Sequence, residues 1–251
     1  MESPFIRTEL LLGKAALARL ARCRVAVFGL GGVGGYAAEA LVRTGVGALD
    51  LIDPDRICPS NLNRQILATE QTLGSYKVDV ARERFLSINP NVQLRTYACF
   101  YLPQTANQFD FRQYDYVVDA IDTVTGKIAL VLASREAGVP ILSSMGTGGK
   151  LDPTRLEVAD LSETSMCGLA RIMRKELRRR GINHLKVVYS KEEPPVSDDD
   201  AGQIQEQAPE QGASVVLPKR KTPGTAIFVP AAAGLIIASQ VVQDLLASAD
   251  G

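Results

Sequence analysis

A short apolar run followed at once by a cluster of glycines constrains the fold of this chain more than any other feature. Residues 24–28 read RVAVF, which is typical of a buried parallel strand. The glycines that follow are Gly29, Gly31, Gly32 and Gly34. In a strand–loop–helix unit, such glycines permit a tight turn, a close approach of the backbone to a phosphate, and close packing of helix on strand. The N–H groups that start the next helix then face the phosphates. The pattern predicts a nucleotide-binding loop without saying which nucleotide it binds.

The rest of the chain repeats the order strand, helix, strand. The apolar pattern predicts further strands and helices in alternation: strands over 48–53, 93–98, 116–119 and 139–143, helices over 36–43, 75–88 and 125–137. We therefore expect an α/β fold with a Rossmann-like, doubly wound, mostly parallel sheet.

The character of the sequence changes beyond Gly149. We expect a C-terminal extension with strands over 156–160 and 185–189, a basic helix over 166–180, a mobile polar loop over 191–214 and a final packed helix over 229–247. The whole chain, 1–251, is predicted to form one domain. Its parts are an N-terminal arm and helix (1–23, with the helix over 13–21), a nucleotide-binding core (24–150) and a C-terminal part (151–251).

Composition excludes some classes of protein. The chain of 251 residues carries 28 basic and 28 acidic residues, so its zero net charge argues against a surface coated in nucleic acid, although a local basic patch stays open. Residues 226–246 form the longest apolar stretch, but Pro230 and Gly234 lie inside it, so we expect a buried helix and no membrane partner. The N-terminus lacks the features of a signal peptide.

The cysteines show no paired spacing. Cys23, Cys58, Cys99 and Cys167 lie far apart, and His184 is the only histidine. Zinc sites need closely spaced ligand pairs, so no structural zinc is expected, and no disulfide framework either. The sequence therefore predicts a protein of the reduced cytoplasm.

Polar residues after the second strand distinguish between nucleotides. Asp53 ends that strand, where an acid can bind ribose hydroxyls, and up to this point an NAD-dependent dehydrogenase fits equally well. A hydride-transfer site does not need the side chains that follow, Asn61, Arg64 and Lys77. If a carboxylate attacked the α-phosphate of ATP, Arg64 and Lys77 could neutralise the charge on the leaving pyrophosphate, and Asn61 could orient a phosphate oxygen.

Two further carboxylates follow a central strand. Asp119 and Asp122 lie at the C-terminal end of the predicted strand over 116–119, where a carboxylate can hold Mg²⁺ near the phosphates. Asp122 is the expected metal ligand, whereas Asp119 either contacts the nucleotide or only caps the loop.

The ordered series of these motifs resembles the adenylation domain of ubiquitin-activating-type, or ThiF-like, enzymes. The resemblance covers roughly residues 5–160 and rests on the glycine cluster together with Asp53-x-Asp55, Asn61-x-x-Arg64-Gln65, Gly74-x-x-Lys77 and Asp119-x-x-Asp122. It implies that the glycines, Asp53, Asp55 and Gln65 bind ATP. It also implies that Arg64 and Lys77 contact the phosphates of ATP and that Asp122 organises Mg²⁺. The segment 7–13 also resembles the N-terminal arginine segment of the family, which implies a homodimer with Arg7 in the neighbouring site.

Within that family, the details are most similar to the tRNA threonylcarbamoyladenosine dehydratase branch. The similar segments are DAIDTVTGK (119–127), GTGGKLDP (146–153), GLAR (168–171) and GTAIFVP (224–230). This resemblance implies ATP-dependent activation of a carboxylate on a modified tRNA nucleoside, followed by ring closure with loss of AMP. A sulfur-transfer protein is a further possible partner. Sulfur-carrier-activating relatives usually have two Cys-x-x-Cys pairs, which this sequence lacks, and Cys167 is the only candidate for an acyl-accepting thiol.

The predicted basic helix has two interpretations. Arg171, Arg174, Lys175 and Arg178 share one helical face by their spacing. They form either an ordinary solvated face or a surface that contacts the phosphate backbone of tRNA.

Three functions remain open from the sequence. The leading one is a tRNA dehydratase, and the second is an enzyme that adenylates the C-terminus of a small ubiquitin-like carrier. The third is an NAD-dependent oxidoreductase or a nucleotide sensor, against which Asn61, Arg64 and Lys77 argue.

Overall fold

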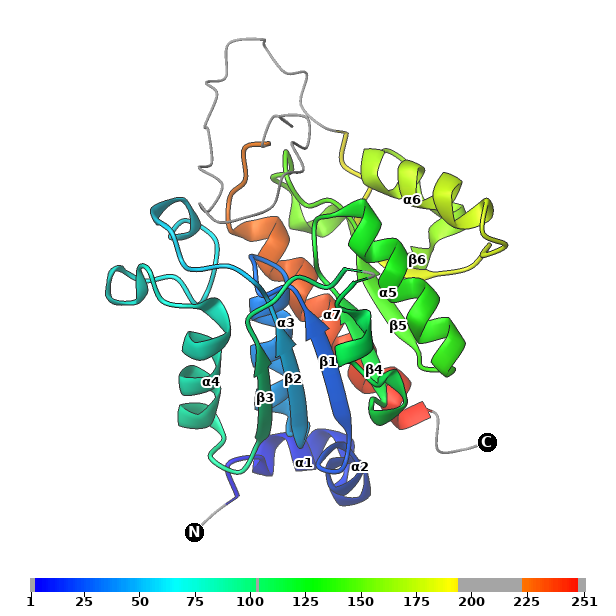
Figure 1. Ribbon diagram of the computed structural model, residues 1–251. Helices are drawn as coiled ribbons and strands as arrows, with labels where there is room; N and C mark the ends of the chain where they lie inside the picture. Colours follow the sequence, from blue (N-terminus) through cyan, green and yellow to red (C-terminus); the bar gives the residue numbers. More distant parts are fainter. Residues whose placement is uncertain (1–2, 103, 194–222, 248–251) are drawn as a thin grey trace.

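The computed structural model describes residues 3–102, 104–193 and 223–247. Seven strands form one sheet with the order β3-β2-β1-β4-β5-β7-β6. Their bounds are β1 Arg24–Phe28, β2 Ala48–Ile52, β3 Gln93–Tyr97, β4 Tyr116–Asp119, β5 Ile141–Ser144, β6 Leu156–Asp160 and β7 Lys186–Ser190. All neighbours pair in parallel except β6, which runs antiparallel to β7 at the sheet edge. The predicted doubly wound, mostly parallel sheet is confirmed (Figure 1).

Helices cover both faces of the sheet (Figure 1). They are α1 Ile6–Leu12, α2 Lys14–Leu20, α3 Gly34–Thr44, α4 Lys77–Ile88, α5 Val124–Ala137, α6 Gly168–Arg178 and α7 Phe228–Ala247. One face packs against α3, α4 and α7, and the other against α5, α6 and the connection between β3 and β4. Short 3-10 turns lie in the connections, among them η1 Pro59–Asn61 and η6 Leu161–Glu163.

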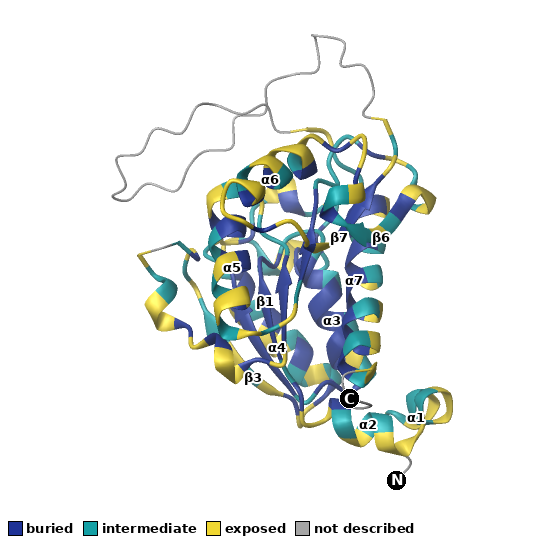
Figure 2. Cartoon of the chain, turned by 90° about the vertical axis from the view of Figure 1, so that its right-hand side faces the viewer, coloured by how far each residue is buried: buried dark blue, intermediate teal, exposed yellow. Residues whose placement is uncertain are grey.

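Burial on both faces explains why the central strands read as continuous apolar runs. Val25 and Val27 of β1 face the cluster of α3 and α7, whereas Ala26 and Phe28 face the opposite cluster. Figure 2 shows the central strands buried and the outer sides of the helices exposed. Phe28 is paired with both Ile52 and Asp119, so the C-terminal ends of β1, β2 and β4 lie side by side. This edge places the loops that follow these three strands next to one another.

The final helix packs directly on the glycine-loop helix. A Cβ atom at Gly234 of α7 would lie 2.4 Å from the Val33 carbonyl oxygen just before α3, so only glycine allows this close crossing. By length and composition α7 is the one helix among the described residues that could cross a membrane, but half of its most apolar window is buried in the protein. Its packing agrees with the predicted core helix.

The structure differs from the prediction at two helices. The helix expected over 13–21 is present as α2 Lys14–Leu20, but the helix α1 Ile6–Leu12 before it was not predicted, and Gly13 with φ +90° separates the two. The basic helix starts at Gly168 and not at residue 166, because Met166 has φ +53° and lies outside helical geometry. Of the predicted mobile loop over 191–214, residues 194–214 lie outside the described residues.

Candidate functional site

The glycine loop between β1 and α3 has a conformation that only glycine permits. Gly29 has φ +89°, and a Cβ there would lie 2.6 Å from the Ala120 carbonyl oxygen. A Cβ at Gly34 would lie 1.8 Å from the carbonyl oxygen of Gly29. The close passage of β1's loop over the end of β4 thus depends on these two residues. Helix α3 begins at Gly34, two residues before the predicted start at residue 36, so its first N–H groups point out of the C-terminal edge of the sheet.

Asp53 ties the end of β2 to this loop. One of its carboxylate oxygens accepts the N–H of Leu30 at 2.6 Å, and the other accepts the N–H of Asp55 at 2.9 Å. The side chain is buried, and burial raises the pKa of Asp53, an effect that the nearby Lys77 ammonium only partly offsets. A buried carboxylate beside a phosphate loop is suited to accept ribose hydroxyls, as the sequence predicted.

Lys77 lies between two carboxylates. Its Nζ is 2.8 Å from Oδ2 of Asp55 and 3.7 Å from Oδ1 of Asp53. The lysine side chain is 6% exposed, whereas that of Asp55 is 53% exposed. The cation is therefore held beside the buried Asp53, while its other partner, Asp55, is open to solvent.

Asn61 and Gln65 form the floor of the loop after β2. Both are buried. Asn61 ends η1, and its Oδ1 accepts the N–H of Cys58 at 3.2 Å. The Oε1 atom of Gln65 is buried without a hydrogen-bond partner among the residues that the structure describes. Its amide nitrogen lies 3.9 Å from the position that a Cβ on Gly31 would take. A buried carbonyl oxygen without a donor is costly unless a ligand supplies one, so Gln65 fits a site whose ligand carries a hydroxyl or amino group.

Arg64 reaches over the glycine loop. Its Cγ lies 3.5 Å from the position of a Cβ on Gly32, and its Nη1 donates to the Ser60 carbonyl oxygen at 2.6 Å. A second bond of 3.1 Å joins Nη1 to Asn63 Oδ1. Among the described residues, the guanidinium bonds only to these neutral acceptors and retains donors for a phosphate.

Of the two roles predicted for Asp119, the structure fits the loop cap: its Oδ1 accepts the N–H of Ile121 at 3.3 Å, and the buried carboxylate is not free to contact a nucleotide. Its side chain is fully buried and pairs with Lys127 at 3.0 Å and with Ser143 Oγ at 2.5 Å. Lys127, also fully buried, donates in addition to the Ser144 carbonyl oxygen at 2.7 Å. The pair joins β4 to α5, and the bonds to Ser143 and Ser144 tie both to β5. The sequence motif contained Lys127, but its burial was not foreseen, because a lone lysine at the start of a helix gives no sign that it points inward.

Asp122 lies on the exposed loop that precedes α5. Within residues 3–102, 104–193 and 223–247, no group of three His, Cys, Asp or Glu side chains is arranged to hold a metal. Mg²⁺ in nucleotide sites takes one or two carboxylates and completes its shell with phosphate oxygens and water. A single exposed carboxylate at the edge of the phosphate loop fits that kind of site, and does not fit a cage made of protein ligands alone.

The segment before α7 closes the site, which the sequence analysis did not predict. The carbonyl oxygen of Thr225 accepts the Asn63 side-chain amide at 2.8 Å, and that of Gly224 accepts the Gly149 N–H at 2.8 Å. Pro230 lies 3.3 Å from the Cβ position of Gly32. Residues 223–230 therefore bridge the loops after β2 and β5 above the glycine loop. The adjacent glycines Gly148 and Gly149 were the sequence feature that could have indicated this contact, because a Cβ at Gly148 would lie 2.5 Å from Pro223.

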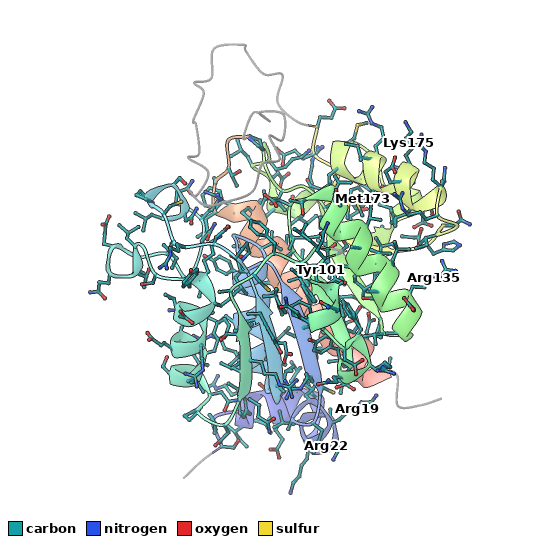
Figure 3. All side chains as sticks on the ribbon, viewed as in Figure 1. Arg19, Arg22, Tyr101, Arg135, Met173 and Lys175 are labelled. Carbon is teal, nitrogen blue, oxygen red and sulfur yellow. The ribbon has the colours of Figure 1, made fainter. Side chains whose placement is uncertain are left out.

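Two sets of predicted residues lie away from this edge. Arg7 is exposed on α1, at the opposite edge of the sheet from its own glycine loop (Figure 1). On α6, Lys175 faces outward while Met173 is buried toward α5 (Figure 3). Arg171 and Arg178 are also exposed. Arg174 departs from the predicted basic face, because its Nη2 donates to the carbonyl oxygen and the hydroxyl of Thr164 at 3.0 and 3.1 Å.

Cys167 is a structural cap in this arrangement. The residue is buried, and its sulfur accepts the N–H of Ala170 at 3.5 Å at the start of α6. A thiol that accepts acyl groups needs access to its substrate, so the geometry favours the structural interpretation of Cys167.

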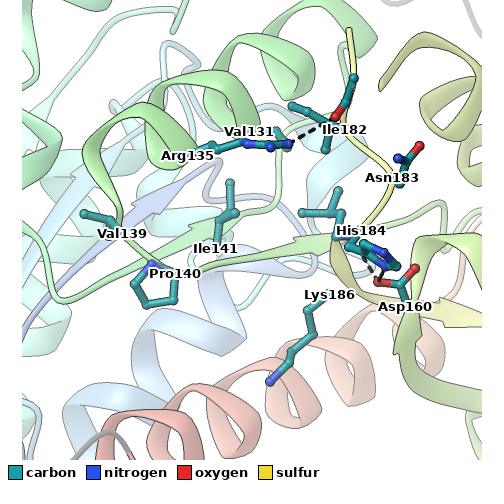
Figure 4. A pocket seen from close by; sticks show the side chains of 12 residues that line it. Val131, Arg135, Val139, Pro140, Ile141, Asp160, Ile182, Asn183, His184 and Lys186 are labelled. Atoms are coloured by element: carbon teal, nitrogen blue, oxygen red, sulfur yellow. Dashed lines mark hydrogen bonds and ion pairs between the residues drawn. The ribbon is translucent and has the colours of Figure 1, made fainter. Parts of the chain in front are cut away.

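One groove of the described structure lies away from this edge. It has a volume of about 480 Å³ and lies between the end of α5 and the start of β7 (Figure 4). Arg135, Asp160 and His184 line it, and none of the predicted site residues does. It opens at the N-terminal ends of β5 and β7, so it is separate from the nucleotide edge.

Comparison with known proteins agrees with the geometry of the nucleotide edge. The ThiF family model matches residues 6–249. The chain is 40% identical over 243 residues to the tRNA threonylcarbamoyladenosine dehydratase of Bacillus subtilis, covering 96% of this chain and 94% of that protein. It is 34% identical over 142 residues to the adenylyltransferase and sulfurtransferase uba4 of Aspergillus clavatus, covering 56% of this chain and 29% of the relative. The solved structure of Escherichia coli tRNA N6-threonylcarbamoyladenosine dehydratase in complex with ATP superposes with a TM-score of 0.85 at 33% identity, covering 98% and 95% of the two chains. The chain therefore belongs to the ThiF family of adenylating enzymes.

Proposed function

We propose that this chain is an ATP-dependent dehydratase that cyclises threonylcarbamoyladenosine in tRNA through an acyl-adenylate. The observation that carries the proposal is the placement of Arg64 against Gly32, with Lys77 held between Asp53 and Asp55 at the same edge. Similarity over nearly the full chain to dehydratases of this name supports the substrate.

The proposed reaction has two steps. In the first, a carboxylate oxygen of the substrate attacks the α-phosphate of ATP, and the bond to the bridging oxygen of the β-phosphate breaks, releasing pyrophosphate. In the second, a nucleophilic group of the same modified nucleoside attacks the activated acyl carbon, AMP leaves with the former carboxylate oxygen, and a proton passes to solvent. The nucleoside thereby loses the elements of one water.

Each residue of the site is assigned to the part of the nucleotide nearest to it. The glycine loop and the start of α3 supply N–H groups to the phosphates, and Asp53 accepts ribose hydroxyls. Arg64 and Lys77 neutralise charge on the departing pyrophosphate, where it grows most in the transition state. The unpaired Gln65 amide gains a partner when the nucleotide binds.

Asp122 is the residue we assign to Mg²⁺. The metal, held between this carboxylate and the phosphate oxygens, would screen the negative charge of the triphosphate against the incoming carboxylate.

We further propose a homodimer in which Arg7 of each chain contacts the phosphates in the neighbouring chain. The position of α1 supports this, because Arg7 cannot reach its own glycine loop from the opposite edge of the sheet (Figure 1). On α6, Arg171, Lys175 and Arg178 form the surface for the tRNA backbone. Arg174 instead joins that helix to the preceding loop by donating a hydrogen bond to the Thr164 carbonyl oxygen.

We assign the enzyme to the cytoplasm, where tRNA and ATP meet and where its four free thiols stay reduced. A sulfur-transfer protein stays a possible partner. It would have to act without Cys167 as an accessible thiol, since that residue is buried.

The test combines two readouts on the purified protein: ATP consumption and the mass of the nucleosides, each with tRNA that carries or lacks threonylcarbamoyladenosine. We expect AMP and pyrophosphate only with the modified tRNA, together with loss of one water from the modified nucleoside. AMP formation stimulated by a ubiquitin-like carrier and not by tRNA would instead establish the adenylyltransferase function, which the similarity to uba4 favours.

A further inference from the structure

A small antiparallel bridge outside the phosphate-binding residues fixes the place of Lys77. Arg56 and Tyr76 pair across it as an isolated bridge. Two more backbone bonds extend the pairing, from Ile57 N to the Ser75 carbonyl at 2.9 Å and from Lys77 N to the Asp55 carbonyl at 3.0 Å. Lys77 is thus joined to Asp55 by its backbone as well as by its side chain.

The side chain of Arg56 locks this bridge. Its guanidinium carbon lies 3.7 Å from the centroid of the Tyr76 ring, as in a cation–π contact. Its Nη1 donates to the carbonyl oxygen of Gly74 at 2.8 Å. Gly74 has φ +81° and forms the turn that leads into α4. One cation therefore holds both the turn before α4 and the residue that directly precedes Lys77.

Lys77 needs such support because it stands at the first position of α4 and no side-chain cap orders that helix end. Its four-carbon stem is flexible, and orienting it costs side-chain entropy. With the backbone of Lys77 fixed beside Asp55, the ammonium is held in a single place 3.7 Å from Asp53 before any nucleotide binds.

We propose that Arg56 and Tyr76 are positioning residues that hold Lys77 for contact with the β- and γ-phosphates of the nucleotide. Neither residue touches the nucleotide itself; both act through Lys77. The inference rests on the proposed ATP site but does not depend on the identity of the acyl substrate.

The test measures binding of ATP and of AMP to the full chain by calorimetry, without tRNA. AMP lacks the phosphates that Lys77 contacts, so it reports on the rest of the site. We expect Arg56→Ala to weaken ATP binding about tenfold while AMP binding changes less than about twofold. Arg56→Lys, which keeps a cation over the ring, should recover part of the loss, and Tyr76→Phe, which keeps the ring, should bind ATP like the wild type.

A double-mutant cycle separates positioning from general support. If Arg56 acts through Lys77, Arg56→Ala adds no further loss of ATP affinity in a Lys77→Ala background. Arg82→Ala on the exposed side of the same helix is the matched control, which removes one arginine without touching the bridge. An equal loss of ATP affinity in both backgrounds, or an equal loss for ATP and AMP, would overturn the inference. Failure of the tRNA substrate to react would refute the dehydratase proposal and leave this result unaffected.

Discussion

Two buried lysines at the same edge of the sheet show how one kind of contact serves two purposes. Lys127 and Asp119 are both fully buried, and Ser143 and Ser144 satisfy their remaining bonds. Lys77 is also buried, but it pairs with Asp55, a carboxylate that is half exposed. The first pair is closed to any ligand and can only stabilise the fold. The second pair can exchange a partner, which is what binding a phosphate requires.

The largest effect is expected in the closed pair. Lys127→Met leaves the Asp119 carboxylate buried without its cation, so we expect a loss of about 3–5 kcal/mol in the free energy of unfolding, measured in urea. Adding Asp119→Asn should recover much of this loss, because the uncompensated charge is removed. A loss under about 1 kcal/mol for the single variant would show that the pair is not structural.

Next in size is the effect of Arg64 on the chemistry. Arg64→Ala should lower kcat for AMP formation by about 100-fold or more, since it removes a donor from the departing pyrophosphate. The free energy of unfolding should change by less than about 0.5 kcal/mol, because the side chain bonds only to neighbouring loop atoms. Full activity in this variant would remove Arg64 from the proposed mechanism.

Asp53, the buried carboxylate beside the open pair, should make both stability and ATP binding depend on pH. Burial raises the pKa of Asp53, so the folded protein takes up this proton at a higher pH than the unfolded chain does. Its contribution to stability is therefore present at low pH and lost as the pH rises through the raised pKa. ATP binding has the opposite dependence, because the ribose and Lys77 need the charged carboxylate. We expect ATP affinity, measured by calorimetry, to fall on acidification at a pH above the ordinary range of aspartate.

Asp53→Asn provides the control for this pH dependence. The variant should bind ATP about tenfold more weakly at neutral pH and should lose the acid-dependent change. If the change persists in Asp53→Asn, another group is responsible for it.

The smallest effect among these predictions is expected for Arg171, through its contribution to tRNA binding. Arg171 is exposed on α6 and has no acidic partner in the described part of the chain. Arg171→Ala should weaken tRNA binding only severalfold and lower the slope of log affinity against log salt by about one. Arg174→Ala should instead act on the melting temperature of the protein, since its contacts are with Thr164. Equal effects of both variants on the salt slope would restore the four-residue basic face that the sequence predicted.

The sequence predicted most of the fold because periodicity and glycine placement are local signals. The alternation of apolar strands and helices predicted a doubly wound, mostly parallel sheet, and Gly29 and Gly34 are required by close backbone contacts in the loop after β1. Helix α1 and the late start of α6 at Gly168 were missed, and the second of these depends on Met166, a single residue with positive φ.

The site was predicted in its parts and not in its connections. Asp53, Arg64 and Lys77 converge as expected, because the ends of parallel strands share one edge. What the pattern does not contain is where a side chain points. Asp119 and Asp122 have the same chemistry in one motif, yet one is sealed by Lys127 and the other is exposed. Likewise, the bridge of residues 223–230 over the glycine loop joins segments far apart in the chain.

Attack of the substrate carboxylate on the α-phosphate is the central claim, and an isotope label tests it most directly. Modified tRNA with oxygen-18 in the carboxylate of threonylcarbamoyladenosine is converted with ATP, and the released AMP, pyrophosphate and nucleoside are analysed by mass spectrometry. The proposed acyl-adenylate predicts one labelled oxygen in AMP and none in pyrophosphate. Label in pyrophosphate or orthophosphate, or unlabelled AMP beside a cyclised nucleoside, would contradict the mechanism.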